Sequence, residues 1–326
     1  MGSPWRTGLN ESISQLGPGL DFTSVNLWEA TVQGNHTAAG DNTTHVLEVQ
    51  AHASDQAWLI VGSINDATHP MIVRGHVAHL HHGIPGPGFA GFANTSPARA
   101  VDLVDDYVWI QGLVVTQTIN TSENFPSVLI NTASEQSEVV DVLVYNAVNI
   151  GTGQAHGLDI RAITCTVINT LIHNCDGHGV VAEPGSYTLY NVTATNNAGF
   201  GILNVVGSTM VAKNCLSTGN VAGQFQGNFA AGSTENVSSD ATAPGTNPVI
   251  NASVGYVDAL NDDFHLTEAD RTAIGTGADL SADPTFPFDQ DIDRATILTW
   301  HPGFDSVNLT SSRRQTSLLD GWFRNQ

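Results

Sequence analysis

The sequence predicts an all-β fold, a right-handed parallel β-helix solenoid with an N-terminal cap and an irregular C-terminal tail. The main observation is an internal repeat. Four glycines, Gly157, Gly179, Gly201 and Gly223, follow one another at intervals of 22 residues. The second observation is composition, since glycine, asparagine and β-branched residues are frequent and aromatic residues make up only 7% of the chain. Both are typical of many short strands joined by tight turns.

A period of 22 residues fits one coil with three strands and three turns. At about 3.3 Å per strand residue, three strands of four to five residues plus their turns need roughly 20 to 25 residues. Asn174 and Asn196 precede two of the glycines by five residues. Asparagine tolerates left-handed backbone at a corner, and glycine allows positive φ or close backbone approach. We therefore expect these glycines and asparagines to stack in columns.

The chain divides into three parts by pattern. Residues 1–56 are expected to form the N-terminal cap and first coil. Residues 57–232 are expected to form the parallel β-helix, with a long loop at 76–104 that is rich in Gly, Pro and His. Residues 233–326 are expected to form a C-terminal excursion, a cap and a tail or arm. A solenoid must cover its last coil, so a cap and a partner-docking arm are both open interpretations of this tail.

The charge balance is strongly acidic. Asp and Glu number 31 against 10 Lys and Arg, for a net charge of −21, and Lys213 is the one lysine. A field of this sign repels phosphate backbones and anionic membrane surfaces, so we predict no nucleic-acid partner and no membrane insertion. Adaptation to molar salt explains the scarcity of lysine, because salt screens the self-repulsion of a carboxylate surface. An ordinary acidic secreted protein is the alternative.

Targeting and redox signals are sparse. No run of 18 apolar residues occurs, and Met1 to Asn10 lacks the features of a secretory signal. The three cysteines, Cys165, Cys175 and Cys215, lack the spacing of a disulfide framework. We expect them to be small buried residues, with a Cys165–Cys175 bridge as the alternative.

Three stretches resemble the pectin-lyase-like right-handed parallel β-helix superfamily. The opening FTSVNLWEATVQGNHTAAGDNTTHVLEVQAH (22–52) is similar to the N-terminal cap and first coil of viral and environmental bacterial members. The coils at 140–226 resemble their repeats punctuated by Asn and Gly, and DDFHLTEADRTAIGTGADLS (262–281) resembles their closing motif. The resemblance implies the fold and says little about function, because this fold carries lyases, hydrolases, viral spikes and adhesins.

The candidate catalytic residues are His156, Asp159, Asp176 and His178. The two histidines are 22 residues apart, so we expect them to stack on adjacent coils. The run CDGHGVV (175–181) resembles the Gly-His-Gly of polygalacturonase-like hydrolases, but those enzymes need paired aspartates, and Asp159 and Asp176 do not share a column. Two histidines that cap a turn column are the favoured interpretation.

The candidate metal ligands are four closely spaced histidines. Imidazoles bind Zn²⁺ well, and His76, His79, His81 and His82 all fall in the expected long loop. The favoured interpretation is a solvated loop. No cofactor is therefore predicted, and a divalent cation is left open as the alternative.

Three functions compete. The first is a virion surface structural protein, such as a spike, turret or tail-associated protein that attaches to a host surface at high salt, in a tailed virus of haloarchaea. It would form a homo-oligomer, for example a trimer, and would contact other virion proteins and a host glycan or glycoprotein, which places it in the virion or outside the cell. The alternatives are a polysaccharide lyase or glycoside hydrolase, and a cell-surface protein of a halophile.

Overall fold

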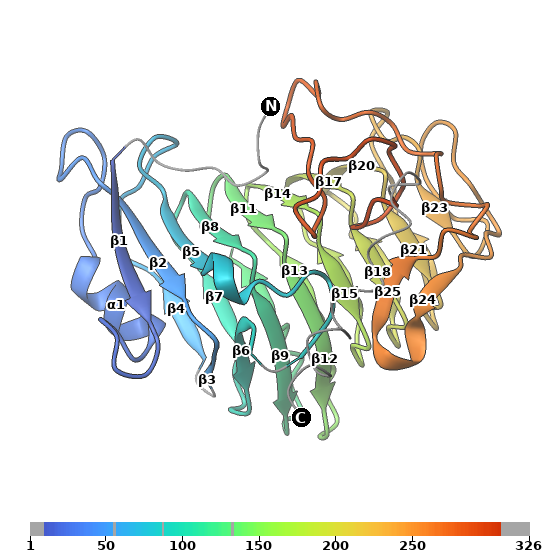
Figure 1. Ribbon diagram of the computed structural model, residues 1–326. Helices are drawn as coiled ribbons and strands as arrows, with labels where there is room; N and C mark the ends of the chain where they lie inside the picture. Colours follow the sequence, from blue (N-terminus) through green and yellow to red (C-terminus); the bar gives the residue numbers. More distant parts are fainter. Residues whose placement is uncertain (1–9, 55–56, 87, 132–133, 308–326) are drawn as a thin grey trace, which may run out of the picture.

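The computed structural model describes residues 10–54, 57–86, 88–131 and 134–307 of the 326-residue chain. Within them the chain is nearly all β-structure, wound into a right-handed parallel β-helix as the repeat predicts (Figure 1). The described residues contain one α-helix, α1 (Val25–Val32), and two short 3₁₀ helices, η1 (Val77–His79) and η2 (Ala259–Asn261). No helix in the described segments is long and apolar enough to cross a bilayer.

Three parallel sheets form the walls of the solenoid, and each coil visits them in the same order. The first sheet contains β1 (Glu11–Leu16), β2 (Thr44–Val49), β5 (Met71–Gly75), β8 (Val108–Gln111), β11 (Ser137–Val140), β14 (Thr164–Ile168), β17 (Ser186–Tyr190) and β20 (Thr209–Lys213). The second contains β3 (His52–Ser54), β6 (Ala90–Asn94), β9 (Val114–Ile119), β12 (Leu143–Asn149), β15 (Leu171–His173), β18 (Thr193–Thr195), β21 (Leu216–Thr218) and β23 (Val237–Ser238). The third contains β4 (Trp58–Ile60), β7 (Val101–Leu103), β10 (Val128–Ile130), β13 (Leu158–Ile160), β16 (Val180–Ala182), β19 (Phe200–Asn204) and β22 (Gly223–Gln226). A separate antiparallel pair joins β24 (Tyr256–Asp258) to β25 (Asp263–Leu266).

The 22-residue period holds through two coil steps and then lengthens. Leu158 pairs with Val180, and Val180 pairs with Ile202, each 22 residues on. Ile202 pairs with Phe225, which is 23 residues on. Gly157, Gly179 and Gly201 therefore share a column, whereas Gly223 lies opposite Phe200. The expectation of one column of four glycines is corrected to three, because one residue is inserted in the last coil.

The repeated glycines and asparagines have different structural roles: the glycines allow close packing of coils, and the asparagines adopt left-handed backbone at corners. Gly157, Gly179 and Gly201 are absent from the positive-φ positions, but a Cβ on Gly179 would lie 2.6 Å from the carbonyl oxygen of Gly201. These glycines therefore permit close approach of neighbouring coils. Asn174 and Asn196, each with a φ of 55°, turn the corner in the left-handed conformation. The same conformation recurs at a second corner at Asn169, Asn191 and Asn214.

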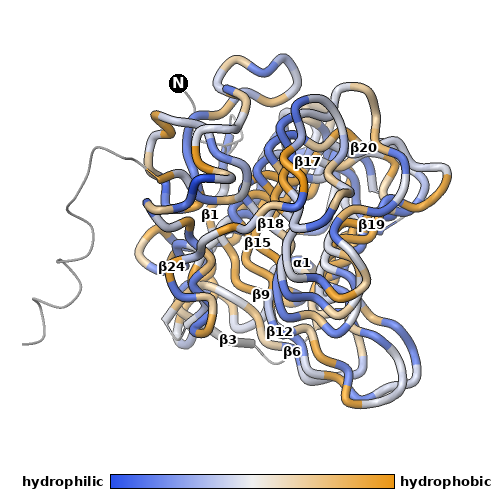
Figure 2. Tube along the Cα trace, turned by 90° about the vertical axis from the view of Figure 1, so that its right-hand side faces the viewer, coloured by the Kyte–Doolittle hydropathy of each residue, from blue (hydrophilic) through white to orange (hydrophobic). Residues whose placement is uncertain are grey.

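The core lies inside the coils. Viewed along the stack, successive coils overlap one behind another (Figure 2). Alternate residues of each strand point inward, so Leu158, Val180 and Ile202 are fully buried in one continuous cluster. At the N-terminal end α1 contributes Val25 and Trp28 to the same cluster and covers the first coil. Burial of this apolar face is what stabilises the stack.

The segment expected as a long loop contains two strands of the solenoid. Both β6 and β7 lie within residues 76–104. β6 pairs with β9 in the second sheet, and β7 pairs with β10 in the third. The abundant Gly and Pro concealed these strands. One of the glycines, Gly91, lies inside β6, where a Cβ would lie 2.4 Å from the carbonyl oxygen of Val114. The described parts outside strands are mainly 76–86 and 88–89, with η1 in the first of them, and 95–100 between β6 and β7.

The polar stretch at 227–253, expected as an excursion, continues the coil. Single bridges join Phe229 to Met210 and Thr234 to Lys213, and β23 pairs with β21. Residues 255–307, which we call the C-terminal strap, then run back over the outside of the first and second sheets (Figure 1). The aromatic and arginine residues at the end of the tail lie outside the described residues: Arg313, Arg314, Trp322, Phe323 and Arg324.

The three cysteines are free and buried in the wall of the solenoid. Burial raises the pKa of the Cys175 and Cys215 thiols to about 12, and also raises that of Cys165. The interpretation as small buried residues is confirmed, and the alternative Cys165–Cys175 bridge is not formed.

Candidate functional site

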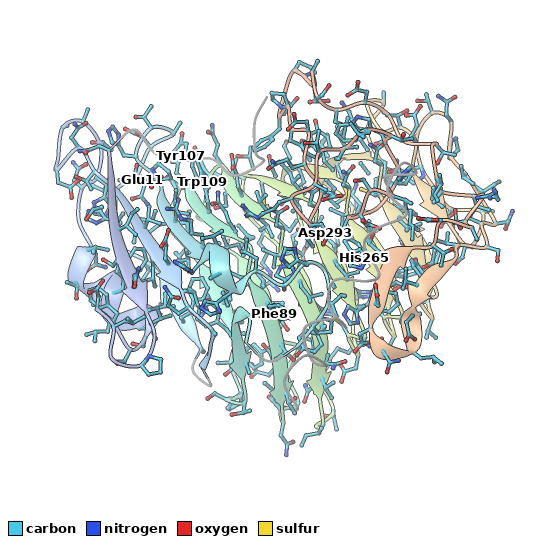
Figure 3. All side chains as sticks on the ribbon, in the orientation of Figure 1. Glu11, Phe89, Tyr107, Trp109, His265 and Asp293 are labelled. Carbon is cyan, nitrogen blue, oxygen red and sulfur yellow. The ribbon has the colours of Figure 1, made fainter. Side chains whose placement is uncertain are left out.

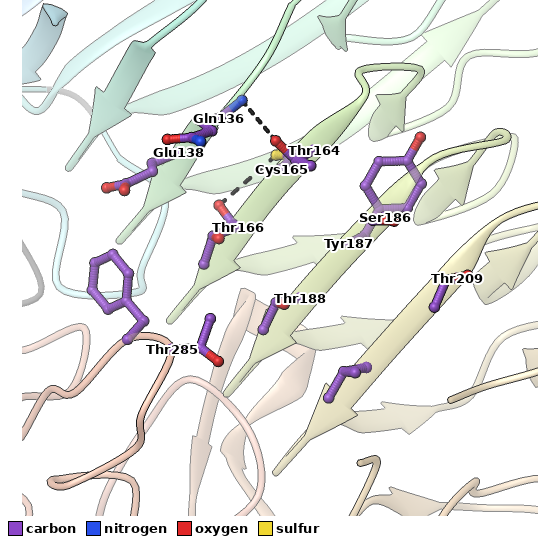
Figure 4. Close-up of a pocket in the computed structure, with 12 residues that line it drawn as sticks. Gln136, Glu138, Thr164, Cys165, Thr166, Ser186, Tyr187, Thr188, Thr209 and Thr285 are labelled. Atoms are coloured by element: carbon purple, nitrogen blue, oxygen red, sulfur yellow. Dashed lines mark hydrogen bonds between the residues drawn. The ribbon is translucent and has the colours of Figure 1, made fainter. Parts of the chain in front are cut away.

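A groove of about 390 Å³ lies on the outer face of the first sheet (Figure 4). Its floor is formed by outward side chains of β11, β14, β17 and β20. One column runs through Glu138, Thr166, Thr188 and Val211, which are paired in register. Strands in a sheet lie about 4.8 Å apart, so these side chains form a regularly spaced row.

The groove exists because two neighbouring outward columns differ in polarity. Two residues further along the same strands, the outward positions hold Val140, Ile168 and Tyr190, which are buried beneath the strap. An exposed apolar column would cost free energy, so the strap covers it. The threonine column needs no such cover and stays partly exposed. The strap residues Thr285 and Phe286 thereby form the wall of the groove.

A single aspartate of the strap holds this wall on the sheet. Asp283 accepts a hydrogen bond from the Tyr190 hydroxyl at 2.8 Å and lies 2.6 Å from the Lys213 ammonium. Burial opposes ionisation of Asp283, but the hydrogen bonds from Lys213, from the backbone and from Tyr190 outweigh it, and its pKa is lowered. The one lysine of the chain therefore fixes the position of the strap beside the groove.

The groove can offer hydrogen bonds in both directions. Hydroxyl groups donate and accept, and Thr164, Thr166 and Thr188 line the groove next to the Glu138 carboxylate. Within the groove Thr164 already accepts a hydrogen bond from the Gln136 backbone at 2.9 Å. None of the residues that line this groove was among the predicted site residues. Thr166 and Thr188 are 22 residues apart, so the same repeat that revealed the glycines could have revealed them.

The predicted catalytic histidines stack, as expected, and cap a turn column. The ring centroids of His156 and His178 are 5.0 Å apart, and Phe200 continues the stack. His156 Nδ1 accepts the backbone N–H of His178 at 2.9 Å, and His178 Nδ1 accepts that of Phe200 at 2.8 Å. Burial lowers the pKa of His156 to about 4 and also lowers that of His178. Each imidazole is thus a neutral acceptor that joins one coil to the next.

The two predicted aspartates lie in different places. Asp176 accepts backbone N–H groups from Asn149 and Ala155, so it also belongs to the turn. Asp159 lies on the outer face of the third sheet, where its Oδ2 is 2.6 Å from the Arg161 guanidinium. The structure therefore brings His156 and His178 together and leaves Asp159 on another face.

A second aspartate, Asp102, lies on the same outer face of the third sheet as Asp159. Asp102, Leu129 and Asp159 are paired in register on the third sheet, so the two carboxylates are about two strand spacings, roughly 9 to 10 Å, apart. Asp102 lies 2.9 Å from the Arg99 guanidinium. Beside Asp102 is a smaller hollow of about 200 Å³, which Trp58 and Phe125 help to line. Asp102 was not among the predicted site residues, because it lies in the segment interpreted as a loop.

The four predicted metal-binding histidines do not converge. His76 Nδ1 accepts the backbone N–H of Ala78, and His79 Nδ1 lies 3.1 Å from the carbonyl oxygen of Gly88. His81 is buried, and its two ring nitrogens bond to the backbone of Asp141 and Gly83. Only His82 among them faces a carboxylate of the strap. The structure therefore does not bring these four candidate ligands together, because the loop backbone turns their rings in different directions.

Two other His/Asp groups are close enough to hold a metal ion among the residues described. The first is His36, Asp41 and His45, near the N-terminal end, where both imidazoles contact Asp41. The second is His265, Asp293 and Asp305, on the strap. This second group was not predicted from the sequence, because Asp293 and Asp305 are distant from His265 in sequence and carry no motif.

Titration in the strap group is strongly perturbed. Burial would lower the pKa of His265, but the hydrogen bond to Asp263 and the negative charges of Asp305 and Asp293 raise it well above its usual value. Burial and the neighbouring Asp305 raise the pKa of Asp291 to about 7. Several carboxylates of the strap therefore lie around one imidazole.

The comparisons with known proteins add little to this geometry. No known family model matches the chain, and no curated protein is detectably similar in sequence. Among solved structures, the crystal structure of pectate lyase Pel9A is similar, with 14% sequence identity and a TM-score of 0.48 over 94% of this chain and 98% of that chain. This likeness carries no argument about activity, and the fold assignment rests on the strand pairing described above.

Proposed function

We propose that this chain is a structural attachment protein whose groove on the first sheet binds a surface glycan. The observation that carries the proposal is the row of partly exposed threonine hydroxyls beside Glu138, set against the Phe286 wall. Sugars present hydroxyl groups that need both donors and acceptors, and their C–H faces pack on apolar walls. The groove offers both, on a rigid parallel sheet that needs little ordering when a ligand binds.

The charge favours a neutral glycan and a salty environment. A net charge of −21 repels an anionic polysaccharide over long range, unless salt screens it. We propose that the chain serves on a virion surface, as a spike, turret or tail-associated protein of a virus of a halophilic host, and assembles there as a homo-oligomer. A cell-surface protein of the halophile is the alternative with the same binding chemistry. Recovery of the chain in purified particles, and not in virus-free cell envelopes, would support the virion.

The glycan proposal is tested by binding in molar salt. The full chain is titrated with panels of neutral and acidic oligosaccharides, and Thr166→Val and Thr188→Val are compared with Thr152→Val. Valine keeps the shape of threonine and removes its hydroxyl, and Thr152 is exposed in the turn after β12 and does not line the groove. We expect each groove variant to weaken binding about 5- to 20-fold, as loss of one hydrogen bond predicts. Equal affinity of all three variants would refute the groove as the binding site.

Cleavage of a polysaccharide is the second candidate, and the pair Asp102 and Asp159 favours it. Carboxyl groups separated by roughly 6.5 to 9.5 Å suit an inverting hydrolase, in which one carboxyl protonates the leaving group and the other activates water. Each carboxylate here lies within ion-pair distance of an arginine, Asp102 of Arg99 and Asp159 of Arg161. Release of reducing ends, or absorbance from unsaturated products, abolished in Asp159→Asn and kept in Thr166→Val, would support this candidate over the first.

A further inference from the structure

The strap brings one imidazole and two carboxylates together in three dimensions. His265 lies on β25, and Asp293 and Asp305 come from later parts of the strap. One ligand atom from each of the three lies within 4.8 Å of the others, and His265 Nε2 is 3.7 Å from Asp293 Oδ2. Figure 3 labels His265 and Asp293 close to each other beside the strap. The three groups therefore surround one small volume.

The imidazole is oriented for a ligand on its free side. Asp263 Oδ1 lies 2.6 Å from His265 Nδ1 and fixes that nitrogen as the donor. His265 Nε2 is buried and has no hydrogen-bond partner among the described residues. Histidines that bind metals usually donate their other ring N–H to a carboxylate in this way, which fixes the ring and increases the basicity of the ligating nitrogen.

Acidic side chains outnumber basic ones around this volume. Asp263, Asp291, Asp293 and Asp305 all belong to this part of the strap, and the guanidinium of Arg294 lies 3.6 Å from Asp141. Buried carboxylates need compensation by a cation or by hydrogen bonds. A divalent ion between His265, Asp293 and Asp305 would supply it.

We propose that the strap binds a divalent cation of the Zn²⁺ class through His265 Nε2 and the carboxylates of Asp293 and Asp305, with Asp263 as the orienting partner. One imidazole with two carboxylates suits Zn²⁺ or a neighbouring transition metal, which accept mixed nitrogen and oxygen ligands. Ca²⁺ and Mg²⁺ prefer oxygen ligands alone. The site is independent of the groove on the first sheet and of the glycan proposal.

The ion would cross-link distant parts of the strap and would lie next to the body of the solenoid. It would join β25 to positions 28 and 40 residues further along the chain. His82, from the segment before β6, has its Nδ1 3.5 Å from Asp293 Oδ1 and is the group of the solenoid body next to the site. A bound metal stabilises the folded state because the unfolded chain has no such site.

The test is metal stoichiometry in the full chain without an affinity tag that binds metals. All variants carry Asp41→Asn, which disables the other His/Asp group, so only the strap site is counted. After treatment with a chelator and dialysis against Zn²⁺, we expect one equivalent in Asp41→Asn and none when His265→Gln or Asp305→Asn is added. Asp279→Asn, an exposed aspartate of the strap, should keep one equivalent. Circular dichroism checks that each variant is folded.

A spectroscopic measurement covers the case in which the site variants fail to fold. Co²⁺ added to the Asp41→Asn chain should give visible absorption bands of a nitrogen- and oxygen-ligated ion, which Zn²⁺ then abolishes. The Tm should rise with Zn²⁺ and not with equal Ca²⁺ or Mg²⁺. The proposal is overturned if the Asp41→Asn chain binds no Zn²⁺, if the His265→Gln variant keeps one equivalent, or if Ca²⁺ binds and Zn²⁺ does not displace it.

Discussion

The stacked histidines make a quantitative prediction about acid stability. His156 is buried and accepts a backbone N–H of the next coil through Nδ1, so the folded state needs it neutral. Burial, with smaller contributions from the charges of His178 and Arg161, lowers its pKa to about 4. An unfolded histidine has a pKa near 6.5. Between pH 6.5 and 4 the unfolded chain therefore takes up a proton that the folded chain does not.

The sign and size follow from this difference. The contribution of His156 to stability is complete above pH 6.5 and is lost as the pH falls towards 4, because protons then favour the unfolded state. For pKa values of about 4 and about 6.5, one such group lowers the free energy of unfolding by about 2 kcal/mol at pH 5 relative to pH 7.5. Burial lowers the pKa of His81 to about 4 and that of His173 to about 3, and both act in the same direction.

The assay is urea denaturation at pH 7.5 and pH 5 for the wild type and for His156→Gln. Glutamine offers a carbonyl acceptor that does not titrate, so the variant should lose about 2 kcal/mol less than the wild type between these two pH values. His81 and His173 are present in both proteins and cancel in the comparison. His79→Gln, at a partly exposed histidine, should lose as much as the wild type. Equal losses in His156→Gln and the wild type would refute the neutral-cap argument.

Three further predictions concern the stack, the strap and the cysteines. Gly179→Ala should lower the free energy of unfolding by about 1 to 3 kcal/mol, because the new Cβ meets the adjacent coil. Gly232→Ala should have little effect in thermal denaturation, because its new Cβ would make only an ordinary van der Waals contact, 3.6 Å from the Val211 side chain. Lys213→Met should cost about 2 kcal/mol, because it leaves the buried Asp283 without its cation, and double-mutant analysis with Asp283→Asn should show that the two losses are not additive. A thiol reagent should label none of the buried cysteines Cys165, Cys175 and Cys215 in the folded chain and all three in denaturant. Rapid labelling of the folded protein would contradict their burial.

Much of the fold follows from the local pattern of the sequence. The 22-residue period, the alternation of apolar and polar residues along a strand, and the asparagines at the corners can all be read from short stretches of sequence. Because each stacked coil shows the same pattern, the coils from about 140 to 226 could be predicted. The prediction was wrong where irregular sequence still forms strands, as in β6 and β7. There, stacking on the next coil decides the conformation, and neighbouring strands override local Gly and Pro signals.

The sites divide in the same way. Two stacked histidines could be predicted from their spacing, but their role as acceptors for the next coil depends on ring orientation. The groove required knowledge of where the strap lies, and the strap group required three segments distant in sequence to meet. By itself the sequence determined the repeating coil, because the backbone groups of each coil form their hydrogen bonds with the adjacent coils. Only tertiary structure decided where the strap packs, because that position depends on which outward column is apolar and on the ion pair of Lys213 with Asp283.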